Sequence, residues 1–96
     1  MVYKNETVTI AATSVGFTAA NLALARSLYG REVKQATCTL EAGQIRAWED
    51  GTAPTTTVGQ IINIGDVFIV GGDNASAFRA IRTGSTSGKI SVAYEV

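Results

Sequence analysis

Histidine is absent from the 96-residue sequence, and cysteine occurs once, as Cys38. Without histidine, Ser-His-Asp and Cys-His nucleophiles and histidine-containing zinc sites are excluded. A lone cysteine cannot form an intramolecular disulfide, and no cluster of cations beside it lowers its pKa, so we predict a buried, apolar Cys38. Acidic residues are scattered singly, apart from Glu49-Asp50, whose side chains point to opposite faces of any strand. We therefore predict no enzyme, no catalytic residue, no cofactor and no metal site.

An excess of charge of either sign is also missing. Eight Lys and Arg residues balance eight Asp and Glu residues, so the chain lacks the basic footprint that drives binding to nucleic acid. No apolar run approaches the roughly 18 residues of a membrane span. The first seven residues carry charge where a secretory signal has its apolar stretch. We expect one soluble domain over residues 1–96, with neither nucleic acid nor membrane as a partner.

Abundant β-branched residues and ten glycines predict an all-β chain, folded as an antiparallel β-sandwich or a partly open barrel. Two hairpins are expected, one pairing Val33–Leu40 with Gln44–Glu49 and the other pairing Ala77–Thr83 with Lys89–Glu95. Alternation along the strands predicts which side chains enter the core. The expected inward residues are Val8, Ile10, Ala36, Cys38, Leu40, Ile90, Val92 and Tyr94.

Residues 18–30 depart from the strand pattern. They are rich in helix formers, Thr18 suits a helix N-cap, and Gly30 suits a C-cap. We expect at most one short helix, near residues 19–29, crossing one end of the sandwich. The alternative is a loop whose leucines, Leu22, Leu24 and Leu28, plug that end.

The run Val67–Val70 is apolar without interruption, so both of its faces can be covered, as in a sandwich core or a subunit contact. Trp48 shares the outer face of its strand with Gln44 and Arg46 if Ile45 and Ala47 point inward. An outward tryptophan beside an arginine suits a protein contact; with a shifted register, Trp48 instead covers the edge of the core. We expect a homo-oligomer, either a dimer or a trimer.

Arg79 and Arg82 fall on opposite faces of one strand, so at least one of them lies at an interface, an edge or a bulge. A buried ion pair is the competing explanation. The candidate protein-interface residues are Arg46, Trp48, Arg79 and Arg82.

Several ordered motifs lie between residues 35 and 96: Ile45-Arg46, Asp50–Thr55, Val58-Gly59, Gly65-Asp66, Phe78–Lys89 and Val92–Glu95. With these motifs, the sequence resembles a group of small structural proteins of tailed-bacteriophage virions, of the capsid decoration or cement type. Where alternating Tyr and Arg are common in that group, this chain has Ala47-Trp48-Glu49.

The resemblance implies a non-enzymatic virion component, made in the host cytoplasm and bound to the capsid exterior. Its partner would be the major capsid protein, whose shell it would stabilise. A small rigid sandwich in many copies suits this role, because avidity multiplies each weak contact. The alternatives are a tail-associated module that binds carbohydrate or a receptor, and a head–tail joining component.

Overall fold

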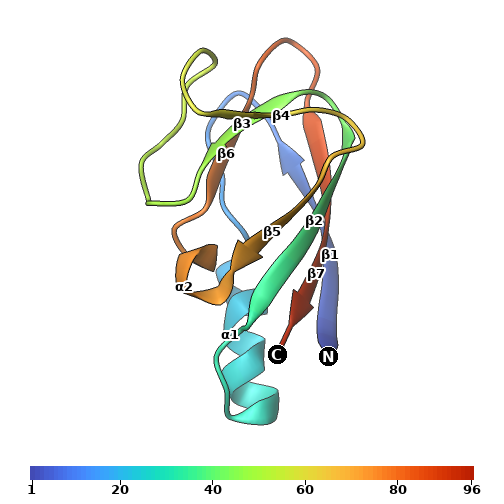
Figure 1. The fold of residues 1–96 in the computed structure, drawn as a ribbon, viewed down its shortest axis with the longest axis vertical. Coiled ribbons are helices and arrows are strands. Elements are labelled where there is room, and N and C mark those ends of the chain that lie inside the picture. Colours follow the sequence, from blue (N-terminus) through green and yellow to red (C-terminus); the bar gives the residue numbers. More distant parts are fainter.

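The computed structural model describes residues 1–96 and consists of two packed antiparallel sheets and two helices (Figure 1). The prediction of an all-β sandwich is confirmed, and the sheets do not close into a barrel. The molecule measures 39 × 23 × 17 Å along its principal axes. The elements are β1 (Val2–Ile10), α1 (Ala19–Tyr29), β2 (Gln35–Ala42), β3 (Ile45–Trp48), β4 (Gln60–Ile62), β5 (Val67–Gly71), α2 (Gly72–Ala75), β6 (Arg79–Arg82) and β7 (Gly88–Glu95).

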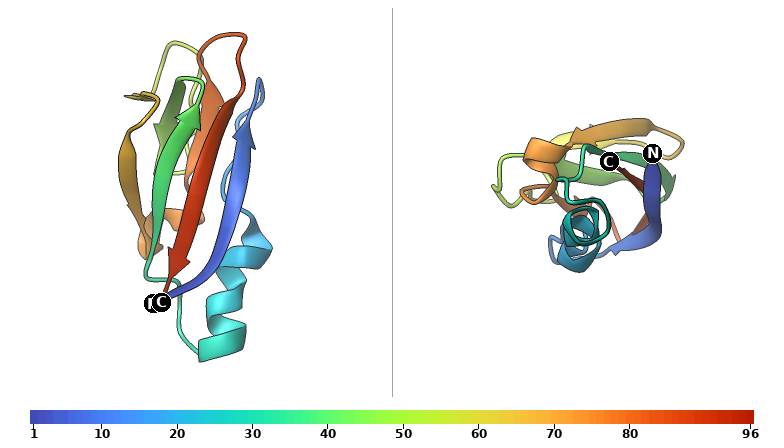
Figure 2. Two further views of the ribbon diagram at one scale, coloured as in Figure 1. Left: turned by 90° about the vertical axis from the view of Figure 1, so that its right-hand side faces the viewer. Right: turned by 90° about the horizontal axis from the view of Figure 1, so that it is seen from below.

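The two sheets differ in size. A four-stranded sheet has the order β1-β7-β2-β5, and a three-stranded sheet has the order β4-β3-β6. Figure 2 shows the long strands β1, β7 and β2 side by side, with the three-stranded sheet behind them. The two chain ends meet at one end of the molecule, where the Val96 amide donates to the Met1 carbonyl over 2.9 Å.

The first expected hairpin is wrong, because β2 and β3 lie in different sheets. β2 pairs with β5 and β7, whereas β3 pairs with β4 and β6. Gly43, between them, has φ +65°, and a Cβ at this position would lie 2.6 Å from the carbonyl oxygen of Ser87. Glycine alone fits this left-handed, tightly packed corner. The corner sends Ile45 into the core from the opposite layer.

The second expected hairpin is wrong for a related reason. β6 belongs to the three-stranded sheet and β7 to the four-stranded one, so residues 83–87 bridge the layers rather than closing a hairpin. The Thr83 amide donates to the Gln44 carbonyl over 3.1 Å, and this hydrogen bond holds the connecting segment in place. β7 then begins at Gly88, where a Cβ would lie 2.5 Å from Cγ2 of Ile45. Both crossings thus meet at one crowded end of the sandwich.

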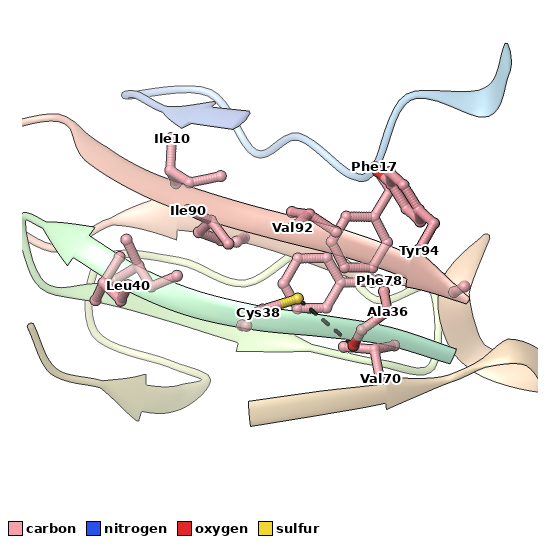
Figure 3. Close-up of a cluster of buried hydrophobic side chains, with 14 residues drawn as sticks. Ile10, Phe17, Ala36, Cys38, Leu40, Val70, Phe78, Ile90, Val92 and Tyr94 are labelled. Atoms are coloured by element: carbon pink, nitrogen blue, oxygen red, sulfur yellow. Dashed lines mark hydrogen bonds between the residues drawn. The ribbon is translucent and has the colours of Figure 1, made fainter. Parts of the chain in front are cut away.

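The predicted alternation of side chains is confirmed. Cys38 is 0% exposed between the outward-facing Thr37 and Thr39, and all the other residues expected to point inward are buried except Val8, which is half-buried against the same core. Figure 3 shows the buried side chains converging between the sheets, and Cys38 Sγ lies 3.7 Å from the carbonyl oxygen of Ala36. The buried cluster comprises Ile10, Phe17, Ala36, Cys38, Leu40, Ile45, Ala47, Val70, Ala75, Phe78, Ala80, Ile90, Val92 and Tyr94.

The predicted helix is present as α1, and the alternative of a plugging loop is wrong. Gly30 ends it in the left-handed region with φ 65°, and its amide donates to the Arg26 carbonyl. Thr18 occupies the N-cap position, but its hydroxyl donates to Glu6 instead of capping the helix. Leu28 is 59% exposed, because α1 extends past the end of the sheets (Figure 1). The single-turn helix α2 was not expected.

The apolar run that forms β5 is covered on one face only. Val70 is fully buried and Phe68 packs partly against the core, whereas Val67 is 66% exposed and Ile69 is 57% exposed. β5 is an edge strand of the four-stranded sheet, so its outward side chains meet solvent in the single chain.

Candidate interaction surface

Three of the four candidate interface residues lie on one face of the three-stranded sheet. Ile45 and Ala47 are buried, so Arg46 and Trp48 point away from the core, and the alternative of a shifted register is wrong. Trp48 is the direct cross-strand partner of Arg79. We call the outer face formed by Arg46, Trp48, Ile61, Arg79 and Ile81 the Trp48 face.

Arg82 does not belong to the Trp48 face. It stands opposite the buried Ile45 at the end of edge strand β6, so its side chain leaves from the inner side of the sheet. There its guanidinium donates to the Ser87 hydroxyl over 3.4 Å. No charged residue is buried, so the alternative of a buried ion pair is wrong. The edge position is what allows arginines on both faces of this strand.

Arg46 fixes the loop between β3 and β4. Its guanidinium donates to the carbonyl of Gly59 over 2.8 Å and to that of Thr56 over 3.2 Å. Pro54, within this loop, is buried, and a Cβ on Gly59 would lie 3.1 Å from the Cβ atoms of both Arg46 and Pro54. These contacts make Arg46 a structural residue that holds the border of the Trp48 face in place.

The start of the same loop is set by Asp50. Its carboxylate accepts a hydrogen bond from the Thr52 amide over 2.9 Å, which holds the pKa of Asp50 below its usual value. The chain bends at Asp50-Gly51, where Gly51 has φ +88°.

Hydrogen bonds orient the Arg79 side chain, but no acidic side chain pairs with its positive charge. Its guanidinium donates to the carbonyl oxygen of Ser14 over 3.3 Å and to the Ser14 hydroxyl over 3.2 Å, and neither acceptor is charged. The one ion pair of the chain joins Arg26 and Glu32 at the far end of α1. Arg79 therefore keeps its positive charge available beside Trp48, which suits contact with an acidic or carbonyl-rich protein surface.

The outer face of the four-stranded sheet has a different chemistry. A shallow depression of about 530 Å³ crosses β1, β7 and β2, and five of its eight lining residues carry hydroxyl or amide side chains. Two neighbouring carboxylates have local partners, since Glu95 accepts from Gln35 and Thr37 while Glu41 accepts from Ser91. The depression is lined by Asn5, Glu6, Thr7, Thr37, Thr39, Ser91, Val92 and Ala93.

Glu6 is the acidic residue with the most elaborate surroundings, and the sequence did not single it out. Burial raises the pKa of Glu6, but hydrogen bonds from Tyr94 and Thr18 outweigh this effect and leave it below the usual value. Burial, together with the Glu6 carboxylate, raises the pKa of Tyr94 well above its usual range, so Tyr94 remains the donor. These hydrogen bonds link strands β1 and β7 to the start of α1. They include no second acidic side chain that could take part in proton transfer.

The remaining acidic side chains and the single cysteine lie apart from one another. No three side chains from His, Cys, Asp and Glu gather closely enough to hold a metal ion. Burial raises the pKa of Cys38 to about 12, with the nearby Glu49 adding to the effect, so its thiolate is strongly disfavoured. Neither helix has the length and apolar character needed to cross a membrane.

Sequence reasoning located Arg46, Trp48 and Arg79 but missed two aliphatic members of the same face, Ile61 and Ile81. Ile81 was detectable, because it alternates with the buried Ala80. Ile61 was not, since its place depends on the pairing of β4 with β3. Comparison with known proteins gives no match among family models, curated sequences or solved structures.

Proposed function

We propose that the chain is a non-enzymatic virion structural protein of a tailed phage, and that it decorates the capsid exterior and stabilises the shell. The single observation that carries the proposal is the Trp48 face. It sets an outward tryptophan directly across from an arginine that has no acidic partner. Tryptophan and arginine are the residue types most enriched at energetically dominant protein contacts.

The sequence resemblance supports the identity of the partner. Two of its motifs build the framework beside the Trp48 face: Arg46 holds the loop carbonyls, and the Asp50-Gly51 turn starts that loop. A fixed framework of this kind lowers the entropic cost of docking. The zero net charge also favours many copies standing close together on one shell, because their mutual repulsion is small.

Co-sedimentation with expanded empty capsids of the encoding phage tests the proposal. The wild-type protein should pellet with the capsids at micromolar concentration and raise the melting temperature of the shell. Trp48→Ala should lose binding while its own melting temperature stays within a few degrees of wild type, and Leu28→Ala, on the exposed end of α1, should bind normally. Wild-type protein that stays in the supernatant would refute the decoration role.

A second candidate is a tail-associated carbohydrate-binding module, favoured by the hydroxyl- and amide-lined depression on the four-stranded sheet. A glycan array distinguishes it. Binding that disappears in Thr37→Val and Thr39→Val, with capsid binding absent, would support this function. Binding lost in Trp48→Ala would place the sugar on the other face.

Imaging of labelled virions distinguishes the decoration protein and the tail module from a head–tail joining component, which would occupy a single vertex.

A further inference from the structure

Strand β5 has an open hydrogen-bonding edge. Toward β2, the Leu40 amide donates to the Asp66 carbonyl over 3.0 Å, and the Gly72 amide donates to the Lys34 carbonyl over 2.7 Å. Hydrogen-bonded pairs alternate along an antiparallel ladder. The backbone groups of residues 68 and 70 therefore also face β2, and those of Val67, Ile69 and Gly71 face away from the sheet.

The other three edges carry features that discourage further pairing, and β5 carries none. Outer strand β1 has Lys4 and Glu6 and a register irregularity near its start. Outer strand β6 has Arg79 and Arg82 and is further covered by a bridge to residue 15. Strand β4 is only three residues long. Charges, bulges and shortness are the devices by which natural sheets protect their edges.

Apolar surface surrounds the open edge. Val67 and Ile69 project from the outer face with 66% and 57% exposure. A groove of about 430 Å³ opens between the edges of β4 and β5, and Phe68, on the inner face of β5, forms part of its wall. The groove is lined by Ala47, Glu49, Gln60, Ile61, Ile62, Phe68, Ile69 and Phe78.

We infer that the occupant of this edge is a second copy of the same chain, with the two β5 strands pairing antiparallel about a two-fold axis at Phe68. This register sets Val67 opposite the partner's Ile69, and both are residues whose backbone groups face outward. Each such pair exchanges two N–H···O=C bonds and brings two exposed aliphatic side chains together. The four-stranded sheets join into one continuous sheet.

Charge favours this occupant, and the pairing of aliphatic side chains favours this register. An uncharged, apolar strand needs an equally uncharged partner strand, and β5 itself meets that requirement. In the register centred on Phe68, Asp66, immediately before β5, stands opposite the partner's uncharged Val70. A register centred on Ile69 instead sets Val67 opposite the partner's Gly71, so it pairs fewer aliphatic side chains. The chosen pairing also brings the partner's Phe68 to the mouth of the groove.

Sedimentation equilibrium of the purified chain, from micromolar to millimolar concentration and without capsids, tests the inference independently of the decoration role. We expect a monomer–dimer equilibrium. Ile69→Pro removes an amide donor that no contact within the chain uses, in both copies of the dimer, and should raise the dissociation constant by about a hundredfold. Val67→Lys keeps all donors and should weaken the dimer through charge, while Val2→Lys on the outer strand β1 should leave it unchanged.

A monomer throughout the concentration range would overturn the inference. So would a dimer that Ile69→Pro and Val67→Lys leave intact, or growth into larger polymers, which a closed two-fold contact does not allow. If Ile69→Pro does not fold, Val67→Lys alone decides the result.

Discussion

The hydroxyl of Tyr94, at 0% exposure in the core, donates a hydrogen bond to the carboxylate of Glu6 on the neighbouring strand β1. The other carboxylate oxygen accepts the Thr18 hydroxyl over 2.7 Å, at the residue that precedes α1. One acidic side chain thereby joins β1, β7 and the start of the helix. It also satisfies the single polar atom that Tyr94 brings into an apolar interior.

Tyr94→Phe tests the energetic weight of this bond. Hydrogen bonds to charged groups contribute about 1.5–3 kcal/mol, so we expect a loss of about 2 kcal/mol. For a domain of this size, that loss lowers the melting temperature by roughly 8–16 °C. Tyr29→Phe, on the partly exposed end of α1, should shift it by less than about 4 °C. Equal shifts in the two variants would show that the Glu6 bond contributes nothing specific.

The pH dependence of stability follows from the same carboxylate. The pKa of Glu6 is lowered on folding, so its contribution is complete above the ordinary value of 4.5 and is lost as the pH falls through the lower folded-state pKa. Thermal melts from neutral pH to about pH 3 should therefore show stability decreasing on the acidic side. Asp50 and Glu95 also have lowered pKa values, so Glu6→Gln should reduce the slope without abolishing it. An unchanged slope in Glu6→Gln would contradict the assignment.

How far the sequence predicts this fold depends on the range of the interactions involved. Alternation along β2 and β7 placed Cys38 and Tyr94 correctly, because the inward or outward direction of a strand residue is a local property. Strand pairing was predicted wrongly at both expected hairpins. There the outcome depends on close approaches between distant residues, such as Gly43 to Ser87, which local patterns do not encode. The Trp48 face was likewise found only in part, since Ile61 reaches it through tertiary pairing.

Gly43 and Gly30 provide a matched pair for testing the crossover corner. Both have φ 65°, but a Cβ on Gly30 would have no atom within 4 Å, whereas one on Gly43 would meet the Ser87 carbonyl. Gly30→Ala should cost about 1 kcal/mol from backbone strain alone. Gly43→Ala should cost at least about 2 kcal/mol more, because a backbone carbonyl must move. Denaturant unfolding measures both, and similar losses would mean that the corner is not tightly packed.

The burial of Cys38 makes a prediction about thiol reactivity. With its pKa raised to about 12 and its side chain enclosed between the sheets, the native thiol should not react with a disulfide reagent at mildly alkaline pH. Reaction should become complete in denaturant. Rapid labelling of the native protein would show that the sheets separate readily at β2.

The most direct test of the decoration role is electron cryomicroscopy of capsids incubated with the purified chain. The account predicts regular density on the shell exterior that fits the sandwich with Trp48 and Arg79 against the major capsid protein. Density with these residues facing solvent, or bare shells at saturating protein, would contradict it.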